Sequence, residues 1–408
     1  MYQPLTYIRI FLIIVTLIIA FCAWSSLYLK LSGWGGLPAQ YLGIVLGLFV
    51  IFNKNKIGPG EMTSVVNWSV ITILMSFVSA FIDWNAKPHL FVFSFCSTYY
   101  GFFLYYILRI WKVSPKELLD IVVFFCIIWV IIEIGQQFTY PNYWFFGRDN
   151  EFGIIENRMG LWRYYIWGVD FVMLLAGIYI GKLVTSNIFS FKVFSYALIF
   201  SIGILCYCSR KHILAILVAI IFSIIKSKGK HKYTLRLVVC FLIFCLIYNF
   251  YADYNEMNSS ISDSQGSGED FIRFLAADFF VNNFSDSPLY PIFGTGFGSV
   301  DLSSKLEGIK DFYKFYTADI GIIGYYSTVG LVGVSAIIYF YYKFIRNWKY
   351  IDLGYKLFAL MKLMLIIFDF WMMWAVGITA YAVFLYLLDE NIRKNKFLKY
   401  ENRNIDIL

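Results

Sequence analysis

Apolar runs of about twenty residues recur along almost the whole chain, and no other feature limits the possible fold so strongly. The 408 residues are 60% hydrophobic and only 15% charged, with a mean hydropathy of +0.67. Soluble globular domains do not carry this composition, whereas a helix of about twenty apolar residues crosses the ~30 Å hydrocarbon core of a bilayer. The sequence therefore predicts an all-α polytopic membrane protein, with residues 1–408 as a single transmembrane domain.

The apolar runs predict about twelve transmembrane helices. Residues 8–29 have no small-residue cleavage site before the next polar stretch, so they are expected to be a first span rather than a signal peptide. Residues 355–388 would make one helix of ~50 Å, which is too long for a single crossing, so a break is expected near Asp369. The predicted spans are 8–29, 37–52, 64–82, 89–110, 118–138, 164–181, 193–208, 212–226, 235–252, 317–343, 355–369 and 371–388.

The distribution of basic residues predicts the orientation of the chain. With the N-terminus inside, the cytoplasmic segments hold 21 Lys and Arg and the outward segments 11, although the outward loops are longer. By the positive-inside rule, both termini are cytoplasmic and residues 253–316 form one large outward loop. The same rule accounts for the net charge of +8, because the basic residues lie in short loops between spans. Nucleic acid is therefore not expected as a partner.

The cysteines and histidines offer little material for a metal site. All seven cysteines lie within apolar runs without a C-x-x-C pattern, which is typical of reduced packing residues. The three histidines are scattered along the chain. We expect no metal and no cofactor.

The outward loop contains a predicted helix and a segment rich in proline and glycine. Ser267–Asp270 match a capping box, and the pattern after it predicts a short amphipathic helix at about 268–284. An irregular loop is expected to follow, because prolines and closely spaced glycines cannot continue a helix. The apolar face of the helix would carry Phe271, Phe274, Leu275 and Phe279, and the glycines of the loop are Gly294, Gly296 and Gly298.

This arrangement resembles the large periplasmic loop of the O-antigen polymerase and O-antigen ligase superfamily, in which an arginine-bearing helix precedes a P-x-x-G-x-G-x-G segment and a further span. Arg273 matches the arginine, and the segment from Asp286 to Gly298 matches the glycine pattern. Ligases carry a histidine eleven residues before a G-x-x-G. Counting back from Gly330 places Asp319 there, which favours a polymerase. The resemblance covers residues 205–340 in detail.

The resemblance implies a fold similar to the C-type glycosyltransferases and a place in the bacterial inner membrane. The implied reaction joins undecaprenyl-diphosphate-linked oligosaccharides, one as donor and one as acceptor, with release of undecaprenyl diphosphate. A flippase and a chain-length regulator would be its partners. Two alternatives stay open: a ligase that transfers the chain to lipid A core, and a flippase or other transporter. A transporter should show internal repeats, and the sequence contains none that we detect.

The resemblance also implies roles for single residues. Arg210, in the short turn C-Y-C-S-R-K-H, and Arg273 would bind the diphosphate, because an arginine fork holds two phosphate oxygens. Apart from the resemblance, Asp319 is a carboxylate at the start of an apolar span and could act as general base. Gly294, Gly296 and Gly298 would lie against the substrate.

Further basic residues of the outward segments are candidate substrate contacts. Lys211 follows Arg210 directly. Arg158 and Arg163 belong to a second outward loop, Thr139–Tyr165, whose aromatic residues could stack on sugars or mark the lipid interface.

Each of these residues also has a structural explanation. Arg210 and Lys211 could simply end two spans, and Arg273 could pair with Glu269. Asp319 could complement a helix dipole. His212 is an alternative base or a neutral structural residue. Within the predicted spans, Glu133 could line a cavity or pair with Arg163.

Overall fold

The computed structural model describes residues 6–21, 37–140, 142, 157–158, 160–164, 166–186, 188–226 and 269–405. Nearly all of this part of the chain is helical, as predicted for an all-α protein. Its one strand pair is a two-residue antiparallel hairpin of β1 (Asn157–Arg158) and β2 (Leu161–Trp162). Asn157 lies opposite Trp162, and Arg158 lies opposite Leu161.

Five helical stretches of the described chain are long and apolar enough to cross a membrane. This confirms the predicted membrane character, whereas a total of about twelve spans stays a prediction, and the predicted span 235–252 lies outside the described residues. The five are α3 (Thr63–Met75) continued by α4 (Phe77–Trp84), α5 (Pro88–Trp111), α6 (Pro115–Thr139), α14 (Ile322–Arg346) and most of α16 (Ala375–Ile405).

Shorter helices and single turns complete the bundle. The helices are α1 (Tyr7–Ala20), α2 (Leu37–Phe52), α7 (Val169–Thr185), α8 (Phe191–Cys206), α9 (Arg210–Lys226) and α15 (Leu353–Leu365). The 3-10 turns are η3 (Lys54–Lys56), η7 (Trp348–Tyr350) and η8 (Trp371–Met373).

Local sequence accounts for several helix ends. Helix α4 ends at Asn85 and α5 at Lys112, both in the left-handed conformation that closes a helix. Pro88 and Pro115 then stand in the first turns of α5 and α6, where a missing backbone N–H costs no hydrogen bond. Helix α7 begins five residues later than the predicted span, after Gly168, whose φ of 128° suits only glycine.

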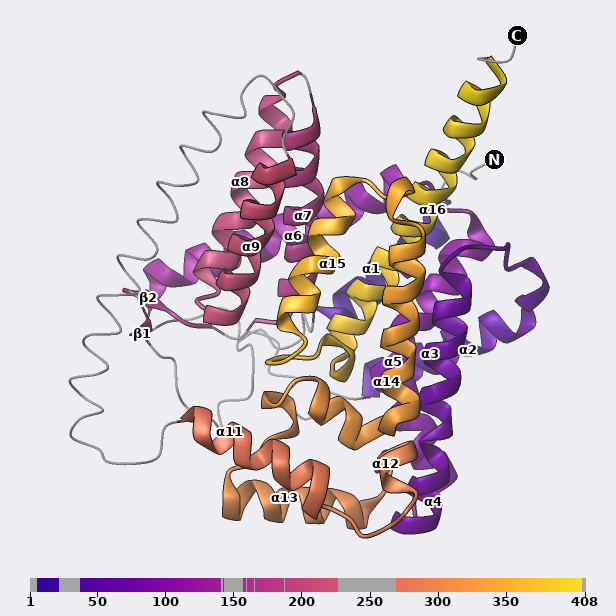
Figure 1. Cartoon of the computed structure of the whole chain (residues 1–408), viewed down its shortest axis with the longest axis vertical. Helices are drawn as coiled ribbons and strands as arrows, with labels where there is room; N and C mark the ends of the chain where they lie inside the picture. The colour runs from indigo at the N-terminus through magenta and orange to yellow at the C-terminus, as the bar shows by residue number, and fades with distance from the viewer. Residues whose placement is uncertain are drawn as a thin grey trace.

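The helices form two groups (Figure 1), and α16 contacts α7 between them. One group is α6, α7, α8 and α9, and the other is α2, α3, α5, α14 and α16. Helix α15 packs against α7 and α9. The predicted break near Asp369 is confirmed, because α15 ends at Leu365 and α16 starts at Ala375. Helix α16 runs on past the predicted span end at 388, since the residues that follow include many helix-forming Lys, Arg and Glu and no Pro or Gly.

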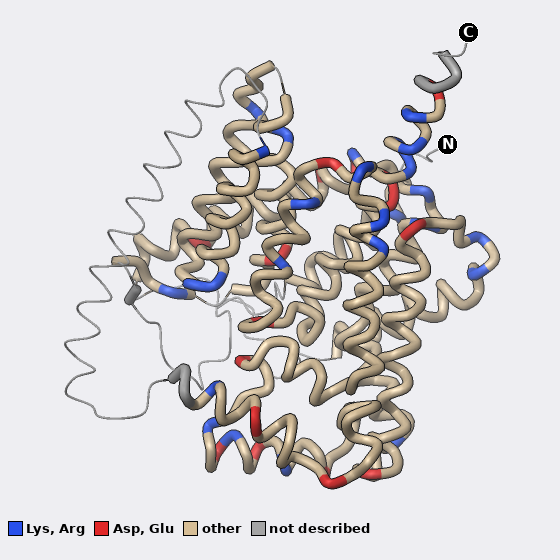
Figure 2. Tube along the Cα trace, viewed as in Figure 1, with Lys and Arg blue, Asp and Glu red and all other residues tan. Residues whose placement is uncertain are grey.

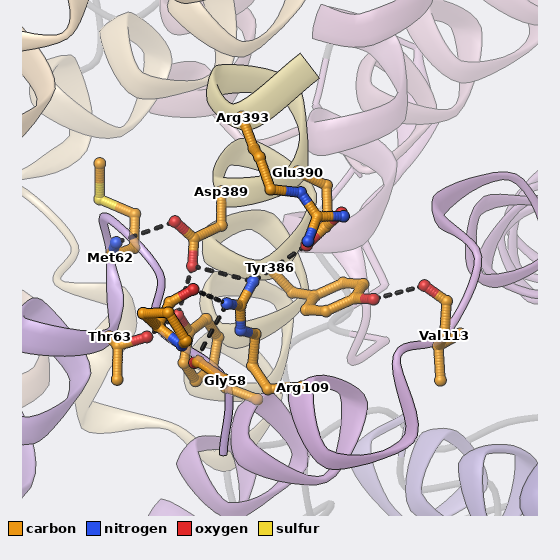
Figure 3. A network of polar contacts seen from close by, with 11 residues as sticks. Gly58, Met62, Thr63, Arg109, Val113, Tyr386, Asp389, Glu390 and Arg393 are labelled. Atoms are coloured by element: carbon orange, nitrogen blue, oxygen red, sulfur yellow. Dashed lines mark hydrogen bonds and ion pairs between the residues drawn. The ribbon is translucent and has the colours of Figure 1, made fainter. Parts of the chain in front are cut away.

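A buried network of polar residues fixes α16 to α5 (Figure 3). The Nη1 atom of Arg109 lies 2.9 Å from Glu390 Oε1 and 3.6 Å from Asp389 Oδ2. Tyr105 donates to Asp389 at 2.6 Å, and the backbone N–H of Met62 donates to the same carboxylate at 3.0 Å. Because these side chains satisfy one another, the network holds helices together rather than offering charges to a ligand.

Four elements of the predicted loop 253–316 and the turn η6 that follows it lie at the end of the bundle opposite the C-terminal end of α16 (Figure 1). Figure 2 shows Lys and Arg gathered around the end from which α16 emerges. The five are α11 (Glu269–Asp278), the π-helical turn η5 (Phe279–Asn283), α12 (Tyr290–Phe293), α13 (Val300–Tyr313) and the 3-10 turn η6 (Thr317–Asp319). This separation is compatible with the predicted topology, whose direction stays a prediction.

Candidate functional site

The loop elements share a hydrophobic cluster of their own. Ala276 belongs to α11, Phe280 belongs to the π-helical turn η5, and Ile320 directly follows Asp319. The cluster therefore holds the arginine-bearing helix and the Asp319 turn in one unit. Its buried members are Ala276, Phe280, Phe284, Tyr290, Leu302, Ile309 and Ile320.

The predicted helix at 268–284 is confirmed from Glu269 to Asn283, but its predicted apolar face is wrong. Phe274 is 76% exposed and Leu275 is 43% exposed. The buried stripe instead runs through Ala276 and Phe280, because these face α13 and the glycine segment. The capping residue Ser267 lies outside the described residues.

The segment from Gly294 to Gly298 packs against three other elements by backbone contact. A Cβ atom on Gly294 would lie 2.3 Å from the backbone of Thr328, and one on Gly298 would lie 2.5 Å from the N atom of Phe91. All three glycines have positive φ. A side chain at these positions would force the segment away from α14 and α5.

The same segment is hydrogen-bonded to a kink in α14. Gly330 interrupts this helix with φ 66° and ψ −172°. The N–H of Thr295 donates to the carbonyl of Ser327, and the N–H of Gly296 donates to that of Thr328, both at 2.8 Å. The conformation of the glycine segment and the kink in α14 are thus held together by these hydrogen bonds.

A cavity of about 280 Å³ lies beneath the glycine segment. Gly296 and Gly298 line it, whereas Gly294 only packs against α14. Phe280, Phe284 and Phe297 form its apolar walls, and no charged side chain lines it among the described residues. Its hydroxyl groups belong to Ser94, Thr295, Ser299, Ser303, Thr317, Ser327 and Thr328.

Helix α13 was not predicted, and it closes the cavity from the loop side. Ser299 caps it by accepting a hydrogen bond from the N–H of Leu302 at 3.2 Å. The ammonium of Lys305 donates to the carbonyl of Phe284 at 2.8 Å and lies 4.6 Å from the centre of that ring. Burial lowers the pKa of Lys305, and the negative charge of Asp286 opposes that shift.

A second cluster, which carries charge, lies at the start of α9. The ammonium of Lys211 is 2.7 Å from the Oδ2 atom of Asp369. His212 is buried, and its Nδ1 atom is 2.8 Å from the hydroxyl of Ser209. The charges of Lys211, Asp369, Lys362 and Arg163 all act on the His212 ring. We call these residues, together with Arg210, the α9 charge cluster.

The structure brings predicted site residues into this cluster and adds two that the sequence left unassigned. Arg210 is exposed at the first position of α9. Asp369 and Lys362 were expected only to mark a break or to reach the interface, yet Asp369 pairs with Lys211 and Lys362 with Asp170. No sequence signal could have found these pairs, because their members are far apart along the chain.

The hairpin that carries Arg158 and Arg163 is held by the end of α6. Gln137 binds both backbone groups of Trp162, donating from Nε2 at 2.7 Å and accepting at Oε1 at 2.7 Å. The hydroxyl of Tyr164 donates to the carbonyl of Gln136 at 2.9 Å. Arg163 is thus fixed between two anchored residues, and Arg158 lies in β1 of the same hairpin.

Backbone contacts join the turn before α14 to the break between α15 and α16. The N–H of Ile322 donates to the carbonyl of Ile366 at 2.8 Å, and a Cβ atom on Gly321 would lie 2.2 Å from the carbonyl oxygen of Ile367. Asp369 follows two residues after Ile367 and pairs with Lys211. The lack of a side chain at Gly321 permits this close approach.

Asp319 and Arg273 both lie on the surface of the loop elements. Asp319 ends η6 and is exposed, two residues after the cavity-lining Thr317. Arg273 is exposed on α11, three residues before Ala276 of the loop cluster. Both side chains are accessible to a ligand.

Glu133 lies in α6, apart from these groups. It is fully buried, and within the described chain neither of its carboxylate oxygens has a hydrogen-bond partner. It therefore makes no hydrogen bond to Arg163. In the same part of the chain, no three His, Cys, Asp or Glu side chains lie together in a way that could hold a metal ion.

Comparison with known proteins gives no family for this chain: no protein-family model matches it, and no curated protein matches its sequence.

Proposed function

We propose that this protein is a membrane glycosyltransferase that polymerises a surface polysaccharide from undecaprenyl-diphosphate-linked repeat units at the periplasmic face of the inner membrane. The observation that carries the proposal is the pairing of two unlike binding surfaces. The α9 charge cluster offers cations, and the cavity beneath the glycine segment offers hydroxyls and aromatic rings without charge. A lipid-linked sugar has these same two parts, a diphosphate and a neutral glycan.

Arginine and lysine suit the diphosphate half of such a substrate. Arg210 is exposed at the first position of α9 and directly precedes Lys211 of the same cluster. Guanidinium groups bind phosphate oxygens in pairs and keep their charge at any working pH. In the proposed reaction they stabilise the negative charge that develops on the leaving diphosphate. Arg273 would supply a further cation from the loop side.

The proposed reaction forms one glycosidic bond and breaks one bond to phosphate. A hydroxyl of the acceptor sugar attacks the anomeric carbon of the donor chain. The bond from that carbon to the diphosphate oxygen breaks, and undecaprenyl diphosphate leaves with the electron pair. The acceptor proton passes to a base, for which Asp319 is our candidate because its carboxylate is exposed beside the cavity.

Deletion of the gene tests the proposal by electrophoresis of the surface polysaccharide. Loss of a polymerase should leave the core with one repeat unit, loss of a ligase only the core, and loss of a flippase no exported repeat. A normal ladder of chain lengths in the deletion strain would contradict all three functions.

The arginines are tested in the complemented strain. Arg210→Ala and Arg273→Ala should abolish long chains at unchanged protein level. Arg273→Lys should restore few long chains, since one ammonium cannot replace the bidentate guanidinium. The matched control is Lys310→Ala, which removes a positive charge from α13 outside the α9 charge cluster. Full ladders in both alanine variants would exclude the diphosphate role of these arginines.

A further inference from the structure

The cavity beneath the glycine segment has hydrogen-bonding properties that select among ligands. Five of its hydroxyls already donate their protons to backbone carbonyls. Thr328 and Ser327 donate to the carbonyl of Gly324, at 3.1 Å and 2.7 Å. Ser303 donates to the carbonyl of Ser299 at 2.9 Å, Ser299 to that of Trp84, and Thr295 to that of Gly296 at 3.1 Å.

A hydroxyl that has donated its proton can still accept hydrogen bonds through its lone pairs. The cavity therefore presents mostly acceptors, and its best ligand brings donors. A phosphate or carboxylate brings acceptors and negative charge, and no cationic side chain of the described chain lines the cavity to receive it. The lining thus disfavours the anionic part of a lipid-linked substrate.

The apolar walls and the size of the cavity further limit the kinds of ligand that can bind. The Phe297 ring stacks on Phe91 at 4.4 Å between ring centres, so its orientation is fixed by α5. The ring centres of Phe280 and Phe284 are 5.3 Å apart, and these two loop residues form the rest of the aromatic wall. Rigid aromatic faces suit the C–H surface of a sugar ring. A volume of about 280 Å³ holds roughly nine waters at ~30 Å³ each, which is about the space of one monosaccharide.

We infer that this cavity is a subsite for a single neutral monosaccharide, either a hexose or an N-acetylhexosamine. Sugar hydroxyls and the N–H of an acetamido group donate to the lining oxygens, and the ring packs on the phenylalanines. The inference rests on the proposed function for its biological setting: the cavity holds one sugar of the repeat unit while the α9 charge cluster holds the diphosphate.

The test is saturation-transfer NMR on the purified full-length protein in lipid nanodiscs. The probes are methyl glycosides of glucose, galactose, N-acetylglucosamine and N-acetylgalactosamine, with methyl glucuronide and inorganic pyrophosphate as anionic comparators. At least one neutral glycoside should receive saturation, whereas methyl glucuronide should receive none at this site. Pyrophosphate should not displace the neutral glycoside.

Two variants test whether the glycoside binds in the cavity. Ser303→Phe fills the space with a ring and should remove the signal. Thr328→Val keeps the shape but removes one acceptor, so the apparent Kd should rise about three- to tenfold. The matched control is Ser304→Phe, an exposed neighbour on α13 that does not line the cavity, and it should bind as the unmodified protein does.

The outcomes separate this inference from the proposed function. No saturation of any neutral glycoside, or equal saturation in Ser303→Phe and Ser304→Phe, overturns the monosaccharide subsite even if deletion of the gene abolishes polymer. Binding that only Ser303→Phe removes supports the subsite even if the deletion strain makes chains of normal length, and in that case polymerisation is the claim that fails.

Discussion

At the scale of single residues, exposure distinguishes the charged groups of the proposed site. Lys211 is engaged by Asp369, and Lys362 by Asp170. Arg210, Arg273 and Asp319 are exposed. The proposed chemistry therefore falls to these three, with Lys211 contributing charge while it stays in its pair.

Asp319→Asn is the sharpest test at this scale. The change keeps the shape of the side chain but removes the proton acceptor, so polymerisation should fall by ~10²–10⁴ if Asp319 is the base. The measurement is the rate of chain elongation in membranes that contain equal amounts of protein. Asp311→Asn, which alters an exposed carboxylate of α13, is the matched control. Near-normal elongation in Asp319→Asn would leave its carboxylate only a helix-dipole role, worth at most ~1 kcal/mol.

At the scale of elements, backbone contact between the glycine segment and three helices builds the site. The segment, the kink of α14 and the start of α5 approach so closely that only glycine fits at several points. Because the contacts are made by main chain, the position of the cavity depends on them more than on any lining side chain.

Gly298→Ala should disrupt this element. Its φ of 83° is strained for alanine, and the new methyl would meet the N atom of Phe91, so a loss of ~2 kcal/mol or more is expected. Gly308→Ala is the control, because Gly308 lies in α13 with no atom within 4 Å of an added Cβ. That change should instead stabilise the helix by ~0.5–1 kcal/mol. Thermal unfolding in detergent compares the two, and equal effects would contradict the close approach.

The Arg109 network gives a second prediction for elements. Arg109→Met leaves the buried Asp389 without its cation and Glu390 with Arg393 alone, and should cost ~3–5 kcal/mol. Tyr386→Phe removes only the hydrogen bond from its hydroxyl to the carbonyl of Val113, and should cost ~1 kcal/mol. Fluorescence-detected size exclusion after heating should rank the variants in that order. The reverse ranking would show that the carboxylates are stable without Arg109.

At the scale of the whole molecule, the loop helices and the C-terminal end of α16 lie at opposite ends of the bundle (Figure 1). By the positive-inside rule, the excess of basic residues on one side predicts that the α16 end is cytoplasmic. The proposed site would then open to the periplasm, where lipid-linked repeat units are polymerised.

Cysteine labelling of intact cells tests this orientation. In a background without the native cysteines, Ser304→Cys on α13 should react with a membrane-impermeant maleimide. Lys399→Cys on α16 should react only after the cells are permeabilised. The opposite pattern would place the α9 charge cluster and the cavity on the cytoplasmic side, which the proposed polymerase cannot use.

The amino-acid sequence by itself determined the features that depend on local pattern. Apolar runs predicted the membrane helices, the length of 355–388 predicted the break near Asp369, and a polar interval with a helical pattern predicted the loop helix. Glycine spacing also marked the segment at Gly294–Gly298. All of these follow from the geometry of one stretch of backbone, which neighbouring residues encode.

Only the tertiary structure decided which groups meet. Lys211 is 158 positions from Asp369, and Arg109 is 281 from Glu390, so no local period relates them. The face of the loop helix was predicted wrongly because packing against α13, and not the helical period, selects Ala276 and Phe280 for burial. The cavity arises where the glycine segment, α13 and the kinked α14 converge. Its shape depends on backbone contacts between separate segments, and a sequence pattern records only which residues permit such contacts.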